Sequence, residues 1–307
     1  MNLFKIKRNP KIVQLDRTTK TLVLDTQYLF LACTILLASI LIRGINSHYF
    51  HFTGNDYIYA HSFFSVILYC LINIMGCYLL EEFNRFTSIF VDILLIIITY
   101  LIVAFATNAI QLTPFLPIDD YILKFEFLKL ENTVDFFNHH HFTRDILIFL
   151  YNSLGTMMYI LPLSLALIRR RQEIHNFCRY ILVGVLIGFT FYFFFPSCGP
   201  ASIFSSHLFM QEQHANHIKF WEIHQGIQPT TINGGLIALP SFHVIWAWAC
   251  CRVAKTVHAF MYYPLLIWFI LVSLSCFVLG WHYSIDILTS LIIILCLEKI
   301  WATEVAP

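Results

Sequence analysis

Charged side chains are scarce in this chain of 307 residues: Asp, Glu, Lys and Arg make up 12% of it, whereas hydrophobic residues make up 58%. An ordinary soluble domain, with about 25% charged residues, is excluded by this balance. The short alternating segments of a membrane β-barrel are also lacking, because the apolar runs are long and unbroken. The sequence therefore predicts an all-α fold, a polytopic helical bundle in a membrane.

Metal-binding and disulfide patterns are also lacking. The nine cysteines show neither zinc nor disulfide spacing, and most lie inside apolar runs, which indicates buried packing. His139, His140 and His141 are adjacent in sequence and cannot all point one way on a helix or strand. We therefore expect no metal and no other cofactor, and we expect no nucleic-acid partner.

Apolar runs long enough to cross a bilayer, which takes about 20 helical residues, recur along the chain. We count about eight: 27–43, 57–80, 88–111, 145–168, 177–196, 237–254, 261–280 and 284–301. No small-residue cleavage site accompanies the first run, so we expect a retained span rather than a removed signal peptide. The resulting divisions are a basic tail at 1–26, N-terminal spans at 27–112, an outer interfacial loop at 113–144, a catalytic membrane core at 145–301 and a short tail at 302–307.

Basic residues are distributed unevenly between the two ends of these spans. The side that carries both chain termini has 14 of the 19 Lys and Arg residues. Because basic residues favour the cytoplasmic side, we expect both termini in the cytoplasm and the opposite ends in the periplasm or lumen. The outer loop 113–144 mixes apolar residues with acids and lysines, which is typical of an element lying on the membrane surface.

Two histidine-bearing segments flank one pair of apolar runs. They read ALPSFHV at 238–244 and GWHYSIDI at 280–287, and 39 positions separate His243 from His282. That distance suits a helix that crosses the membrane, turns at the basic residues near 252–258 and returns. Both histidines would then meet at the outer membrane face, and Asp286, four residues after His282, would share its helix face.

Two histidines and one carboxylate can move a phosphoryl group. Asp286 would hold one ring nitrogen of His282 protonated and leave the other as the nucleophile. His243, which has no such partner in the sequence, would be the general acid for the departing alcohol. A purely structural polar cluster is the alternative that the spacing leaves open.

A phosphate group also needs positive partners. The glycine-rich stretch Asn233-Gly234-Gly235 precedes a helix that begins near Pro240 and leaves backbone N–H groups free. Ser241 and Phe242 are therefore candidates for an anion-binding site at the helix N-terminus. Arg144 begins the fourth span at the outer face, and Lys219 is the only Lys or Arg in the loop 197–235. Both are candidate phosphate contacts.

Residues 239–247 and 279–288 resemble the last two signature motifs of the type 2 phosphatidic acid phosphatase superfamily. The resemblance extends over roughly residues 180–300 and matches residue types, order and spacing. It implies a core helical bundle and a metal-independent mechanism. It also implies a nucleophilic His282, an orienting Asp286 and an acid–base His243.

Two departures from the superfamily's phosphatases stand out. Those enzymes carry Lys, six residues and Arg-Pro in an earlier motif, but this chain has no Arg-Pro dipeptide. They also carry Ser-Arg before the last histidine, where this chain has Ser275-Cys276. The losses resemble those of the branch that includes inositol phosphorylceramide synthase and sphingomyelin synthase. The Pro-Ser-Phe-His motif at 240–243 and the stretch Phe195–Pro200 are similar to sequences of the inositol phosphorylceramide synthase group.

The missing cations agree with a phosphodiester substrate, which carries one negative charge and needs fewer cations than a monoester dianion. The resemblance thus favours a phosphotransferase that moves a phospho-headgroup or phosphoryl unit from a phospholipid donor to a lipid or alcohol acceptor through a phosphohistidine. A lipid phosphate phosphatase acting on phosphatidate or a polyprenyl diphosphate is the second hypothesis. A non-catalytic transporter or scaffold with the same fold is the third.

Overall fold

The computed structural model describes residues 26–46, 48, 65–73, 85–126, 129–204, 206–230, 237–257 and 259–305. Within these ranges the chain has helices and no strand, which confirms the all-α class. The long helices are α2 (Thr26–Ile45), α4 (Arg85–Ile110), α7 (His141–Leu167), α8 (Arg171–Phe194), α10 (Phe242–Val257), α11 (Ala259–Val278) and α12 (Ser284–Val305). The short ones are α5 (Asp119–Lys124), α6 (Leu130–His139), η2 (Pro200–Ser202), η3 (Ser206–Leu208) and α9 (Gln211–His224).

Five helices in the described ranges are long and apolar enough to cross a membrane: α2, α4, α7, α8 and α11. The chain is therefore an integral membrane protein, but the predicted count of about eight spans is not confirmed. α10 has only 16 residues, fewer than the about 20 that a bilayer requires. α12 has 22 residues but carries Asp286, Glu298 and Lys299. The predicted span at 57–80 lies mostly outside the described residues, of which only 65–73 are helical there.

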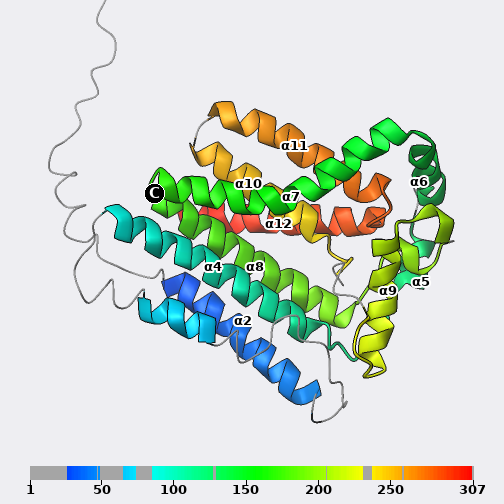
Figure 1. Ribbon diagram of the computed structural model, residues 1–307, viewed down its shortest axis with the longest axis horizontal. Coiled ribbons are helices and arrows are strands. Elements are labelled where there is room, and N and C mark those ends of the chain that lie inside the picture. Colours follow the sequence, from blue (N-terminus) through cyan, green and yellow to red (C-terminus); the bar gives the residue numbers. More distant parts are fainter. Residues whose placement is uncertain are drawn as a thin grey trace, which may run out of the picture.

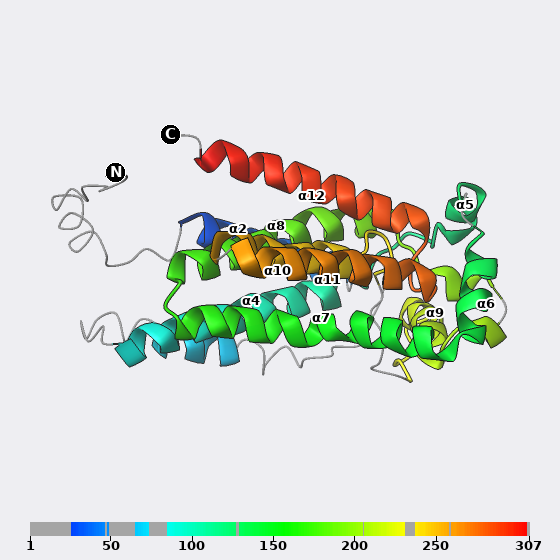
Figure 2. The same cartoon turned by 90° about the horizontal axis from the view of Figure 1, so that it is seen from above.

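The long helices lie side by side in one bundle (Figures 1 and 2). α5, α6 and α9 cover one end of this bundle, which we call the loop end (Figure 1). α10 and α12 both begin at the loop end. α10 runs away from it to Val257, and α11 returns to it from Ala259, so the two helices form the out-and-back pair that the sequence predicts (Figure 1).

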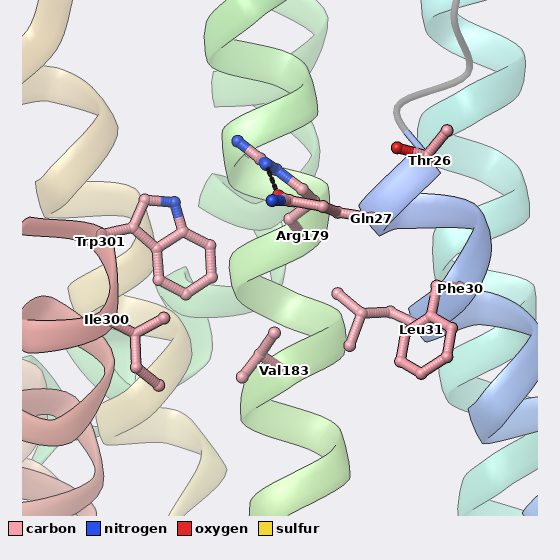
Figure 3. A pocket seen from close by; sticks show the side chains of 8 residues that line it. All are labelled: Thr26, Gln27, Phe30, Leu31, Arg179, Val183, Ile300 and Trp301. Atoms are coloured by element: carbon pink, nitrogen blue, oxygen red, sulfur yellow. Dashed lines mark hydrogen bonds between the residues drawn. The ribbon is translucent and has the colours of Figure 1, made fainter. Parts of the chain in front are cut away.

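At the opposite end of the bundle, charged side chains are bonded to other polar side chains. Asp92 is buried in α4, and its carboxylate lies 3.1 Å from Nε of Arg171 at the start of α8. A pocket of about 340 Å³ lies between α2, α8 and α12 (Figure 3). Arg179 in this pocket donates hydrogen bonds to Gln27 of α2 and, at 2.6 Å, to Asn176. The contacts with Asp92 and Gln27 join α8 to α4 and α2. The pocket residue Trp301 lies 17 residues, about 25 Å of helix, beyond the start of α12.

Polar bonds and apolar contacts fix the short helices to the loop end of the bundle. The Gln213 side chain in α9 donates to the carbonyl of Leu279 at 3.0 Å, and His224 Nε2 lies 2.7 Å from the carbonyl of Thr113. Ile122, Leu130 and Val134 of α5 and α6 are buried in a cluster with Phe209 and Tyr283, among others. The outer loop is therefore packed onto the helix ends that carry the predicted site.

Candidate active site

The turn that carries His282 is built by the end of α11. Gly280 adopts a left-handed conformation with φ +74°, and its N–H donates to the carbonyl of Phe277 at 2.9 Å. The N–H groups of Trp281 and His282 both donate to the carbonyl of Cys276 at 3.1 Å. This bond pattern is the Schellman ending of a helix, for which glycine is the favoured residue. The backbone at His282 is thus held by α11 before α12 begins.

The imidazole of His282 is buried, with 4% of the residue exposed. Its Nδ1 lies 2.8 Å from the carbonyl oxygen of Ala238 and 3.4 Å from Oδ2 of Asp286. A carbonyl oxygen can only accept a hydrogen bond, so Nδ1 carries a hydrogen, and in the neutral ring Nε2 then holds the lone pair. Asp286 is completely buried, and its Oδ2 also accepts the Tyr283 N–H at 2.9 Å.

His243 is the second residue of α10 and is half-buried. The centroids of the His243 and His282 rings are 6.3 Å apart, so the structure brings the two histidines together at the loop end. The His243 ring stacks on Tyr151 of α7, with centroids 4.0 Å apart and planes at 16°. Tyr151 in turn stacks on Trp281 at 4.9 Å and 6°. His243, Tyr151 and Trp281 therefore form one set of nearly parallel rings, an aromatic wall close to His282.

The starts of α10 and α12 are bonded to each other. The Ser241 N–H lies 3.4 Å from the Asp286 carbonyl, and the Ser290 hydroxyl lies within hydrogen-bonding distance of the carbonyls of Ser241, at 3.1 Å, and Asp286, at 2.6 Å. Ser241 is completely buried. The Phe242 side chain points into the core, where it packs edge-on against Phe189. Neither side chain is exposed to solvent, so these residues can bind a ligand only through their backbone groups at the helix N-terminus.

That N-terminus has backbone donors to offer. The first intrahelical bond runs from the Ile245 N–H to the Ser241 carbonyl at 3.3 Å. The N–H groups of Phe242, His243 and Val244 donate to no backbone carbonyl of the described chain. Unsatisfied first-turn N–H groups and the positive end of the helix dipole attract anions. The glycine stretch 233–235 that the sequence places before them lies outside the described residues.

The two candidate cations occupy different environments. Arg144 is half-buried in the first turn of α7, and it lies on the same helix face as Tyr151, seven residues later. Lys219 is completely buried in α9, so its ammonium group is not open to solvent. Burial lowers the pKa of Lys219 to about 8, an effect that Glu222 opposes. Arg144 therefore lies at the start of the helix that carries Tyr151, whereas Lys219 is enclosed by the protein.

The triple-histidine run does not converge on a common point. His139, His140 and His141 are all exposed, and the Nδ1 atoms of the first two lie 2.8 Å from carbonyls of their own helix. Across the described ranges, no three His, Cys, Asp or Glu side chains are grouped so that they could hold a metal ion.

Sequence reasoning missed three groups at or near the histidine pair. The Ala238 carbonyl is a backbone group and leaves no side-chain signal. Tyr151 is one of 15 tyrosines in the chain and lies within an apolar run, where it resembles any packing residue. Asp119 lies in the outer loop beside a second aspartate, Asp120, and its bonds to residues 197–199 join segments about 80 positions apart.

Comparison with known proteins places this site in a family. A family model described as the PAP2 superfamily matches residues 122–298, more than half of the chain, and the matched region contains both histidines and Asp286. No curated protein and no solved structure matches the chain. Members of this superfamily are typically phosphatases and phosphotransferases. The chain therefore belongs to the PAP2 superfamily, as its two histidine motifs predict.

Proposed function

We propose that the protein is a membrane-embedded lipid phosphotransferase that works through a phosphohistidine. The observation that carries this proposal is the geometry of His282: Nδ1 is 2.8 Å from a carbonyl, and the ring lies 6.3 Å, centroid to centroid, from His243. A neutral imidazole with Nδ1 protonated presents Nε2 as a nucleophile. The second imidazole is near enough to serve the same phosphorus centre as acid and base.

The reaction then has two steps. Nε2 of His282 attacks the phosphorus atom, a P–N bond forms, and the P–O bond to the departing alcohol breaks as His243 donates a proton to that oxygen. In the second step His243 takes a proton from the acceptor hydroxyl, whose oxygen attacks phosphorus and releases His282. The N–H groups of residues 242–244 would receive the phosphate oxygens, and Arg144 is the candidate side-chain cation. Asp286 would stabilise the charge that develops on His282 during the first step.

The surroundings of Cys276 support a transferase over a phosphatase. This residue occupies the position where the superfamily's phosphatases carry Arg, and here it is completely buried and its carbonyl holds the turn before His282. A site with fewer cations suits the single charge of a phosphodiester better than a monoester dianion. We therefore propose the inositol phosphorylceramide synthase type of reaction, with a phospholipid donor and a lipid or alcohol acceptor.

The second candidate is a lipid phosphate phosphatase, because water could replace the acceptor alcohol in the second step. We propose that the loop end faces the periplasm or lumen and that the termini face the cytoplasm, which is supported by the 14 of 19 basic residues assigned to the terminal side. In this proposal the catalytic core is residues 145–301.

A product assay distinguishes these functions. Purified full-length protein is given a phospholipid labelled in its headgroup phosphate, together with a ceramide or another long-chain alcohol. A transferase yields diacylglycerol and a new labelled lipid, and a phosphatase yields free phosphate from phosphatidate. We expect the first result, and we expect it to be unchanged by EDTA because the proposed steps use no metal. Absence of every product with all donor classes would favour the scaffold hypothesis.

Tyr151 offers a test of the acid–base role of His243. An aromatic pair contributes about 0.5–1.5 kcal/mol beyond area burial, so loss of the stack should free the His243 ring and lower turnover by about tenfold. We expect this loss in Tyr151→Leu and a change of at most about threefold in Tyr151→Phe, which keeps the ring. Tyr159→Leu, an exposed tyrosine on the same helix, is the matched control. Equal turnover of the Leu and Phe variants would contradict the prediction.

A further inference from the structure

Asp119, the first residue of α5, is a buried carboxylate that the reaction steps above do not use. Only 4% of the residue is exposed. Its Oδ1 accepts hydrogen bonds from the Ser197 hydroxyl at 2.8 Å and the Gly199 N–H at 2.9 Å, and its Oδ2 accepts the Cys198 N–H at 2.9 Å. Burial raises the pKa of Asp119, and these three hydrogen bonds, together with the Tyr283 side chain, oppose the rise. All three donors belong to one turn, residues 197–199.

This turn packs directly against the two residues that frame His282. Gly199 has φ +87°, and a Cβ at this position would lie 3.1 Å from the Trp281 carbonyl oxygen and 3.6 Å from Cβ of Ala238. The segment before α5 strengthens the contact, because the Ile118 N–H donates to the Pro196 carbonyl at 2.9 Å. The outer loop therefore fixes the turn 197–199 at the back of the candidate active site.

A chain of hydrogen bonds continues from this turn to the candidate nucleophile. The Ser197 carbonyl accepts the Ala238 N–H at 3.3 Å. The Ala238 carbonyl then accepts Nδ1–H of His282 at 2.8 Å, a shorter contact than the 3.4 Å from Nδ1 to Asp286. The carbonyl of Ala238 is thus the nearer orienting group of the ring. Its own position depends on Ser197, which Asp119 holds.

We propose that Asp119 is a positioning residue for His282. By anchoring the turn 197–199, it fixes the Ala238 carbonyl, which in turn sets the orientation and the protonated nitrogen of the His282 ring. Asp119 contacts neither the phosphate nor the rings themselves. A displacement of about 1 Å in a reacting group can cost about 100-fold in rate, so a remote anchor of this kind affects turnover more than substrate binding. The inference rests on the proposed function.

The test is Asp119→Asn in the full-length protein, assayed with the phospholipid donor in the product assay. Asn has nearly the same size, but its NH2 group would face a backbone N–H and cannot accept a hydrogen bond. We expect kcat to fall by about 10- to 100-fold and KM to change by less than about threefold. The rate at which labelled phosphohistidine forms in a single turnover should fall by the same factor as kcat.

Asp120→Asn, an exposed neighbour on the same helix, is the matched control and should retain wild-type kcat. Ser197→Ala removes the next link and should lower kcat in the same direction, which keeps the proposal testable if Asp119→Asn does not fold. The kcat of the double variant should be no lower than that of the less active single variant, because both changes break one path. Multiplicative losses, a change in KM alone, or a kcat loss that matches the fraction of unfolded protein would overturn the proposal.

The outcome also separates this inference from the proposed function. If His282→Gln is inactive while Asp119→Asn keeps wild-type kcat, only the role of Asp119 is overturned. If His282→Gln keeps its activity, the proposed function itself is wrong.

Discussion

Replacement of His282 by Gln is expected to lower turnover by at least about 1,000-fold and to remove the covalent phosphoenzyme. Loss of the nucleophile leaves only binding and electrostatic stabilisation, which rarely sustain more than a small residual rate. Gln is chosen because it fills part of the ring's volume and can still donate to the Ala238 carbonyl, so the buried site need not collapse. The measurement combines steady-state turnover with trapping of label on the protein after a rapid quench.

The trapped label has a diagnostic chemistry. A phosphoramidate on histidine is stable in base and labile in acid, whereas a phosphate ester on serine is stable in acid. His207→Gln replaces an exposed histidine elsewhere at the loop end and should leave both turnover and labelling unchanged. Label that persists in His282→Gln would mean that a different side chain is the nucleophile, and the two-step scheme would have to be abandoned.

The approach of the two histidines follows from chain length alone. An interval of 39 residues is enough for one helix out and one helix back, and α10 and α11 use it in this way. His282 and Asp286 are also close, because four residues are about one helical turn. The sequence spacing is enough to predict both approaches, because helices are the way a chain satisfies its backbone groups within a membrane and their geometry is regular.

The orientation of the rings depends on contacts that local geometry does not encode. The Ala238 carbonyl, the Tyr151 ring and the Asp119 carboxylate behind the turn 197–199 come from segments 44 to 163 residues away from His282 in sequence. None of them stands out in the sequence, because they are a backbone oxygen, an aromatic ring within an apolar run and an acidic residue in a loop. Only tertiary packing tells them apart from the many similar groups in the chain.

The outer loop shows how one composition can have two explanations. Its mixture of apolar and charged residues predicts an element lying on the membrane surface, and Tyr121, Phe125 and Phe136 are exposed as such an element requires. The same mixture also contains Ile122, Leu130 and Val134, which are buried against residues near the site. Glu126 adds a polar link, accepting both the N–H and the hydroxyl of Ser284 at 2.8 Å. Composition could not separate the two faces, because they alternate within a few residues.

His243 has a role that is distinct from that of His282, and a change of leaving group should reveal it. A diacylglycerol alkoxide is a poor leaving group and needs a proton, so His243→Gln should lower turnover of a phospholipid by about 100- to 10,000-fold. A nitrophenyl phosphodiester releases a stable phenolate that needs no proton. With this substrate the first step should be nearly normal in the variant, while the second step still lacks its base.

The expected result is therefore a burst of nitrophenolate equal to the amount of enzyme, followed by slow turnover and accumulation of labelled His282. The double variant with His282→Gln should show no burst, and His139→Gln, an exposed histidine in α6, should behave as wild type. A His243→Gln enzyme that is equally slow in the burst and in later turnovers would contradict the assignment. In that case the second imidazole would serve the substrate in some way other than proton transfer, despite the 6.3 Å separation of the two ring centroids.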